Sequence, residues 1–92
     1  MIGFVECECI IYDASSLKEK RAVLKRVITR IRAKFNVSVS EIHYQDTWQR
    51  TSFGIAAVSS SRVQTEKELQ RVLSFIDSFP EIERTITRTE WF

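Results

Sequence analysis

The spacing of the apolar residues changes several times along this chain, and the order of those changes restricts the fold more than any other feature. Residues 2–12 and 82–91 alternate apolar and polar side chains, as half-buried strands do. Residues 37–44 and 48–59 also have strand character, and residues 45–47 form the turn between them. Residues 16–35, and a segment between Ser61 and Pro80, repeat apolar side chains at helical spacing. The predicted order is strand, helix, strand, strand, helix, strand.

This order predicts an α+β fold, the ferredoxin-like βαββαβ plait, over a single domain of residues 1–92. Right-handed crossovers then give a four-stranded antiparallel sheet of order 4-1-3-2. Both helices cover one face of the sheet and the other face stays open. We expect residues 82–91, which are charged and rich in threonine, to be an edge strand. The expected apolar residues of the open face are Phe4, Ile10 and Tyr12, with Phe53 and Ile55 as further candidates.

The first predicted helix carries most of the positive charge. Residues 16–35 hold eight of the fourteen basic residues and one acid, whereas the whole chain has a net charge of only +2. Three cations crowd its first turn, where the helix dipole favours acids. The basic residues predicted to contact phosphate groups are Lys18, Lys20, Arg21, Lys25 and Arg32. A solvated basic face that keeps a small protein soluble explains the same pattern.

The predicted hairpin offers a second set of candidate contacts. Trp48, Gln49 and Arg50 combine an aromatic ring, an amide and a guanidinium, which can stack on an exposed base and hydrogen-bond to it. The alternative is a tryptophan that packs over the end of the sheet. RNA binding on the open sheet face is not expected, because Glu6 and Glu8 would repel phosphates there.

Other functional classes find little support in the sequence. His43 and Asp46 could do acid–base work, but no nucleophile with a clear role stands beside them, so we expect no enzyme. Cys7 and Cys9 read as two small buried thiols, because His43 is the only histidine that could complete a zinc site. We therefore expect no metal, no cofactor and no membrane segment. Unpaired cysteines and the lack of a signal peptide suit the cytoplasm.

Three segments together resemble the YlxP-like family of bacterial proteins. They are Ser16–Arg21, residues 35–41 (FNVSVSE), and residues 45–50 (QDTWQR) followed by Gly54, Ile55 and Ala56. The resemblance covers essentially the whole chain and implies a ferredoxin-like plait of unknown function, without established catalytic residues. Genes of this family commonly lie beside those for transcription elongation, translation initiation and ribosome maturation factors. The resemblance thus implies a role near RNA or a ribosomal subunit.

A protein-interaction module is the alternative hypothesis. The open sheet face or an edge strand would form a homodimer, and the basic helix would meet an acidic protein partner.

Overall fold

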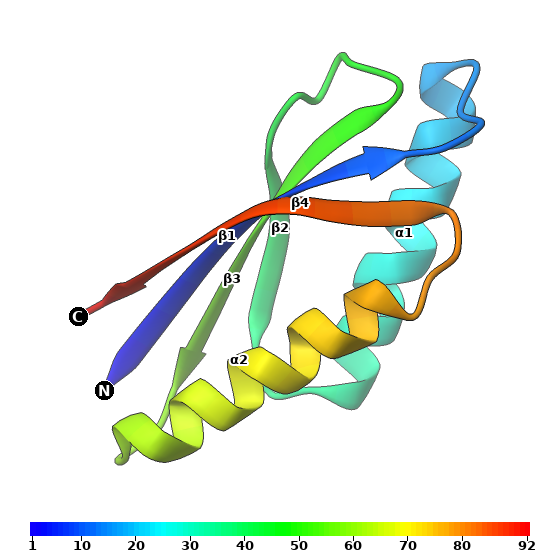
Figure 1. The fold of residues 1–92 in the computed structure, drawn as a ribbon. Coiled ribbons are helices and arrows are strands. Elements are labelled where there is room, and N and C mark those ends of the chain that lie inside the picture. The colour runs from blue at the N-terminus through cyan, green and yellow to red at the C-terminus, as the bar shows by residue number, and fades with distance from the viewer.

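The computed structural model describes all residues, 1–92, and confirms the predicted plait (Figure 1). The elements are β1 (Ile2–Ile11), α1 (Leu17–Lys34), β2 (Ser38–His43), β3 (Arg50–Val58), α2 (Arg62–Asp77) and β4 (Ile82–Trp91). The strands form one antiparallel sheet of order β2-β3-β1-β4, which is the predicted order read from the opposite edge. β2 and β4 are therefore the edge strands.

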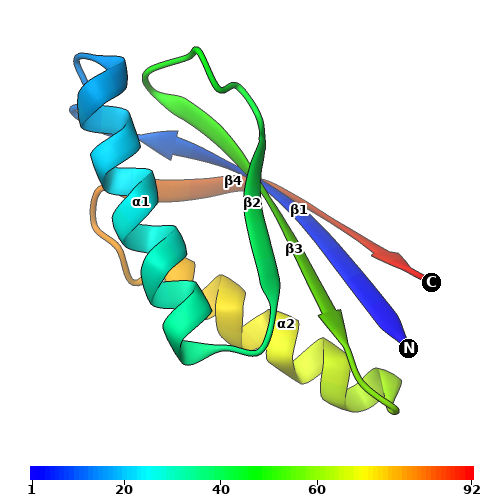
Figure 2. The same cartoon turned by 180° about the vertical axis from the view of Figure 1, so that it is seen from behind.

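Both helices lie on the same face of the sheet (Figures 1 and 2). α1 runs closest to β2, and α2 runs closest to β1, β3 and β4. Neither helix has the length and apolar content needed to cross a membrane.

The core lies between the sheet and these helices. Val5, Cys7 and Ile11 of β1 point into it, and the register pairs Cys7 with Phe53 and Val5 with Ile55. Phe53 and Ile55 are therefore buried beneath the helices. Their prediction as residues of the open face is wrong. Alternation in a strand requires that Phe4, Glu6 and Ile10 point to the opposite, open face.

Both helices start at serine caps. The Ser16 hydroxyl accepts a hydrogen bond from the Glu19 N–H at 3.1 Å, and the Ser61 hydroxyl accepts one from the Gln64 N–H at 3.4 Å. The Glu19 carboxylate accepts from the N–H and the hydroxyl of Ser15, rather than from Ser16 as a regular capping box requires. These two bonds lower the pKa of Glu19.

The hairpin between β2 and β3 differs from the sequence prediction. β2 ends at His43, and β3 begins at Arg50 rather than at Trp48, so the loop covers residues 44–49. Tyr44 has φ of 66°, a left-handed conformation that takes the chain out of the strand. A register shift between Glu41 and His43 interrupts the pairing of β2 with β3.

Candidate nucleic-acid interface

The start of α1 and the β2–β3 loop lie at the same end of the molecule (Figures 1 and 2). The Gln49 side-chain amide donates to the Ala14 carbonyl at 3.3 Å, just before α1. The Lys20 ammonium of α1 donates to the Tyr44 carbonyl in the loop. The fold therefore brings together most of the residues that the sequence analysis selected. We call this region, formed by residues 14–25 and 44–49, the basic end.

The eight basic residues of α1 fall into distinct groups by their contacts. On the side facing α2, Arg26 forms an ion pair with Glu81, Arg30 lies over the Phe79 ring at 5.7 Å, and Lys34 lies over the Phe75 ring at 4.8 Å. These three cations hold α1 against the segment that contains α2 and the start of β4.

The structure contradicts the prediction that Lys20 contacts phosphate groups. Its side chain is fully buried, and its ammonium lies 3.0 Å from a Glu41 carboxylate oxygen. The same oxygen accepts a hydrogen bond from the Thr51 hydroxyl at 2.5 Å. An ammonium enclosed in this way cannot reach a phosphate group. Its place in the first turn of α1 has a structural cause, because it compensates the Glu41 carboxylate between helix and sheet.

Arg32 is exposed but partly engaged. One of its guanidinium nitrogens donates to the Val39 carbonyl of β2 at 3.1 Å. This contact shows that the helix face bearing Arg32 lies toward the β2 edge.

Lys18, Arg21 and Lys25 remain as exposed cations of α1 with no hydrogen bond, ion pair or aromatic partner in the structure. Their spacing of three and four residues places them on one face of the helix. A helical wheel puts Arg32 on the same face, so this cationic stripe follows the β2 side of α1. We call Lys18, Arg21 and Lys25 the free stripe.

The three candidate residues of the hairpin point in different directions. Trp48 is 50% exposed, so half of its surface is open to solvent and the other half is covered by the protein. Gln49 turns toward the start of α1, through its bond to Ala14. Arg50 lies over the Tyr44 ring at 4.5 Å, and its nearest contact with the Glu8 carboxylate is 3.5 Å. Trp48 and Gln49 therefore belong to the basic end, whereas Arg50 lies on the open sheet face.

Tyr44 is the residue that the sequence analysis missed. Its hydroxyl donates to Glu8 at 3.0 Å, its ring lies beneath Arg50, and its carbonyl accepts from Lys20. It thereby links the open face, the hairpin loop and α1. A tyrosine at the predicted end of a strand gives no sequence signal for this role, because the positive φ that produces it is uncommon outside glycine, asparagine and aspartate.

His43 does not pair with Asp46. Its Nε2 lies 3.5 Å from a Glu6 carboxylate oxygen on the open face, and 60% of its side chain is exposed. The acid–base pair considered from the sequence is therefore not assembled.

The two cysteines are buried free thiols, as predicted. A hydrogen bond between them lowers the pKa of Cys7 and raises that of Cys9. Because neither sulfur is exposed, both are shielded from reagents in solvent.

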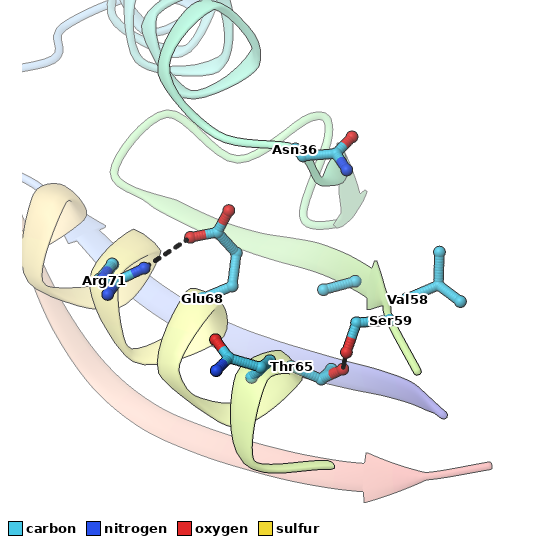
Figure 3. A pocket seen from close by; sticks show the side chains of 8 residues that line it. Asn36, Val58, Ser59, Thr65, Glu68 and Arg71 are labelled. Atoms are coloured by element: carbon cyan, nitrogen blue, oxygen red, sulfur yellow. Dashed lines mark hydrogen bonds and ion pairs between the residues drawn. The ribbon is translucent and has the colours of Figure 1, made fainter. Parts of the chain in front are cut away.

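A polar hollow of about 180 Å³ lies beside the start of α2 (Figure 3). The Ser59 hydroxyl bonds to the Thr65 hydroxyl at 2.7 Å, and Glu68 lies 3.6 Å from Arg71. Asn36, at the end of α1, completes the wall. The hydroxyls of Ser59 and Thr65 and the charges of Glu68 and Arg71 are therefore engaged with one another.

Comparison with known proteins places the chain in a family. Residues 2–89 match the family described as "Protein of unknown function (DUF503)". The chain belongs to the DUF503 family. It is also 89% identical, over all 92 residues and the full length of the relative, to the protein described as "Uncharacterized protein YlxP" of Bacillus subtilis strain 168.

This result confirms the resemblance found in the sequence. The DUF503 description gives no activity, ligand or residue roles. The side chains that bear on the function of this member are therefore its own, above all the free stripe and Trp48.

Proposed function

We propose that this DUF503 protein is a non-catalytic RNA-binding protein that associates with a ribosomal subunit through its basic end. The observation that carries the proposal is the free stripe. Five of the eight cations of α1 have partners within the protein, and Lys18, Arg21 and Lys25 have none. Charges without internal partners are available for phosphates.

The neighbouring loop supports the same ligand class. Trp48 presents half of its surface to solvent at the end where the free stripe begins. An exposed indole ring stacks on an unpaired base, and cations nearby hold the backbone, which is the usual combination for single-stranded RNA. Gln49 keeps little freedom to read a base edge, because its amide is bonded to Ala14.

The experiment is co-sedimentation with purified ribosomal subunits across a salt series. Three phosphate contacts to single-stranded RNA give a log–log salt slope of roughly −2, so affinity falls about 20-fold between 50 and 200 mM salt. The triple variant Lys18→Glu, Arg21→Glu, Lys25→Glu should lose more than about tenfold in affinity. Trp48→Ala should weaken binding by about 1–3 kcal/mol with an unchanged salt slope.

A matched control changes the same charge elsewhere. Arg62, Lys67 and Arg71 are exposed on α2, so their triple glutamate variant alters net charge equally without touching the basic end. The proposal requires this control to bind the subunit more tightly than the α1 variant. If both variants lose the same affinity for the subunit, the interaction depends on net charge and not on the basic end. Binding to neither subunit at low salt would refute the proposal and favour an acidic protein partner.

A further inference from the structure

The two edges of the sheet differ in how well they are protected. β2 is short, carries a register shift at Glu41 and His43, and has its Val39 carbonyl bonded to Arg32. These are devices by which a monomer prevents its edge strand from pairing with another chain. β4 is ten residues long. Its pairing with β1 is irregular only before Thr87, because Cys7 pairs with Thr87 whereas Cys9 pairs with Arg84. The C-terminal part of β4 together with Phe92, residues 86–92, is regular and contains no proline or lysine. No helix or loop runs along its outer side (Figures 1 and 2).

The hydrogen bonds to β1 show which backbone groups of β4 are free. Ile2 and Phe92 exchange both backbone hydrogen bonds, at 3.2 and 2.9 Å. In an antiparallel ladder such pairs alternate with pairs that exchange none. The N–H and C=O groups of Glu90 and Arg88 therefore point toward β1, and those of Trp91, Thr89 and Thr87 point outward.

We propose that the outer edge of β4 binds a second copy of this chain, in an antiparallel pairing with its twofold axis at Thr89. Thr89 then lies opposite itself, and Thr87 lies opposite the partner's Trp91. All three outward-facing residues exchange hydrogen bonds with the partner, about six in total. The two sheets become one continuous eight-stranded sheet.

The side chains select this register. On the open face, Arg88 lies opposite the partner's Glu90, and Ile86 lies opposite the partner's Phe92. Ile86 is 46% exposed and Phe92 is 69% exposed in the single chain, and the pairing covers both. Opposite charges at directly facing positions of a ladder stabilise the pairing.

Neighbouring registers are less favourable. A twofold axis at Arg88 places two arginines opposite each other, and an axis at Glu90 does the same with two glutamates. An axis at Thr87 draws the irregular part of β4 into the pairing. Residues 86–92 are thus complementary to a second copy of themselves only when the twofold axis lies at Thr89. The contact lies at the edge opposite α1 and β2, so it leaves both copies of the basic end free.

Sedimentation equilibrium over a range of protein concentrations tests the pairing. We expect the wild type to form dimers and Thr89→Pro to raise the dissociation constant at least tenfold, because proline removes the central donor. That N–H points away from β1, so the substitution breaks no hydrogen bond within the monomer. Thr89→Val keeps the N–H and is the matched control. It should dimerise like the wild type.

Charge reversal provides a second set of variants, which keep the backbone unchanged. Arg88→Glu and Glu90→Arg should each weaken the dimer, because each places like charges opposite each other. The double variant should restore it, because the complementary pair is re-formed in reverse. A wild type that stays monomeric at the highest soluble concentration overturns the proposal, and so does a Thr89→Pro variant that dimerises normally. RNA binding has no part in this measurement, so its result is separate from that of the subunit experiment.

Discussion

Replacing Lys20 with methionine decides between its predicted and its observed role. The structure encloses this ammonium between Glu41 and the Tyr44 carbonyl, with only 1% of the side chain exposed. Methionine has a similar length and no charge. The substitution therefore leaves the packing of α1 nearly intact and removes the compensation of the Glu41 carboxylate together with the hydrogen bond to the Tyr44 carbonyl.

The expected loss of unfolding free energy depends on the solvent exposure and the hydrogen bond that Glu41 retains. Removing one partner of a buried ion pair typically destabilises a protein by about 3–5 kcal/mol. Glu41 is still 15% exposed and still accepts from Thr51, so the lower end, about 3 kcal/mol, applies. A domain of this size has a stability of roughly 5–14 kcal/mol, so the variant should remain folded. With an m-value of about 1–1.5 kcal/mol/M, the midpoint of urea unfolding should fall by about 2–3 M.

The double variant Lys20→Met, Glu41→Gln is the control. Glutamine removes the unpaired charge but keeps an oxygen for the Thr51 hydroxyl, so about 1–2 kcal/mol should return. If Lys20→Met alone stays within about 0.5 kcal/mol of the wild type, Lys20 behaves as a surface residue and the enclosed ion pair is wrong. In that case the residue returns to the set of candidate phosphate contacts.

Two further predictions concern α2 and the strands it covers. Arg84 donates two hydrogen bonds to the Asp77 carboxylate, at 3.0 and 2.8 Å, and these lower the pKa of Asp77 from its ordinary value of 3.8. Because this pKa is lower in the folded state, the ion pair stabilises the protein above about pH 4, and this stability is lost as the pH falls further. Asp77→Asn should therefore reduce the loss of unfolding free energy at acid pH by well under 1 kcal/mol, as measured by urea unfolding at several pH values. An unchanged pH profile would contradict the ion pair. Gly3→Ala should cost about 1–3 kcal/mol in thermal unfolding, because its Cβ would lie 2.8 Å from Leu69 and 2.9 Å from Trp91; a neutral effect would mean that the start of β1 has room for a methyl group.

The order of the elements was predictable because β1, β4 and both helices carry a clear period, and the segments of β2 and β3 lie on either side of a turn. Apolar alternation identified β1 and β4, strand-type residues on either side of a turn identified β2 and β3, and helical spacing of apolar residues identified α1 and α2. The hairpin was predicted less well, because its length depends on the left-handed Tyr44 and not on a glycine or proline. Which face of β3 meets the helices could not be deduced, since both faces are fairly apolar and only the register with β1 decides.

The error over Lys20 had a signal in the sequence. Lys20 precedes Leu24 by four residues and Val27 by seven, so it occupies the buried face of α1. Glu41 likewise follows Val39 in step on the helix-facing side of β2. Opposite charges at the buried positions of two consecutive elements predict an ion pair between them. Counting every lysine as surface charge concealed this pattern, and the phosphate-binding set was made too large.

The same ion pair bears on how the basic end can function. Lys20 holds the Tyr44 carbonyl, and Tyr44 in turn bonds to Glu8 and lies beneath Arg50. The loop that presents Trp48 is therefore fixed to both the helix and the sheet before any ligand arrives. An aromatic ring on an ordered loop loses little conformational entropy on binding, so most of its stacking energy remains available for affinity. Under the proposed function, this buried lysine contributes to RNA binding by positioning a surface that it does not touch. Lys20→Met should then weaken subunit binding through the position of Trp48 while leaving the salt slope of the free stripe unchanged.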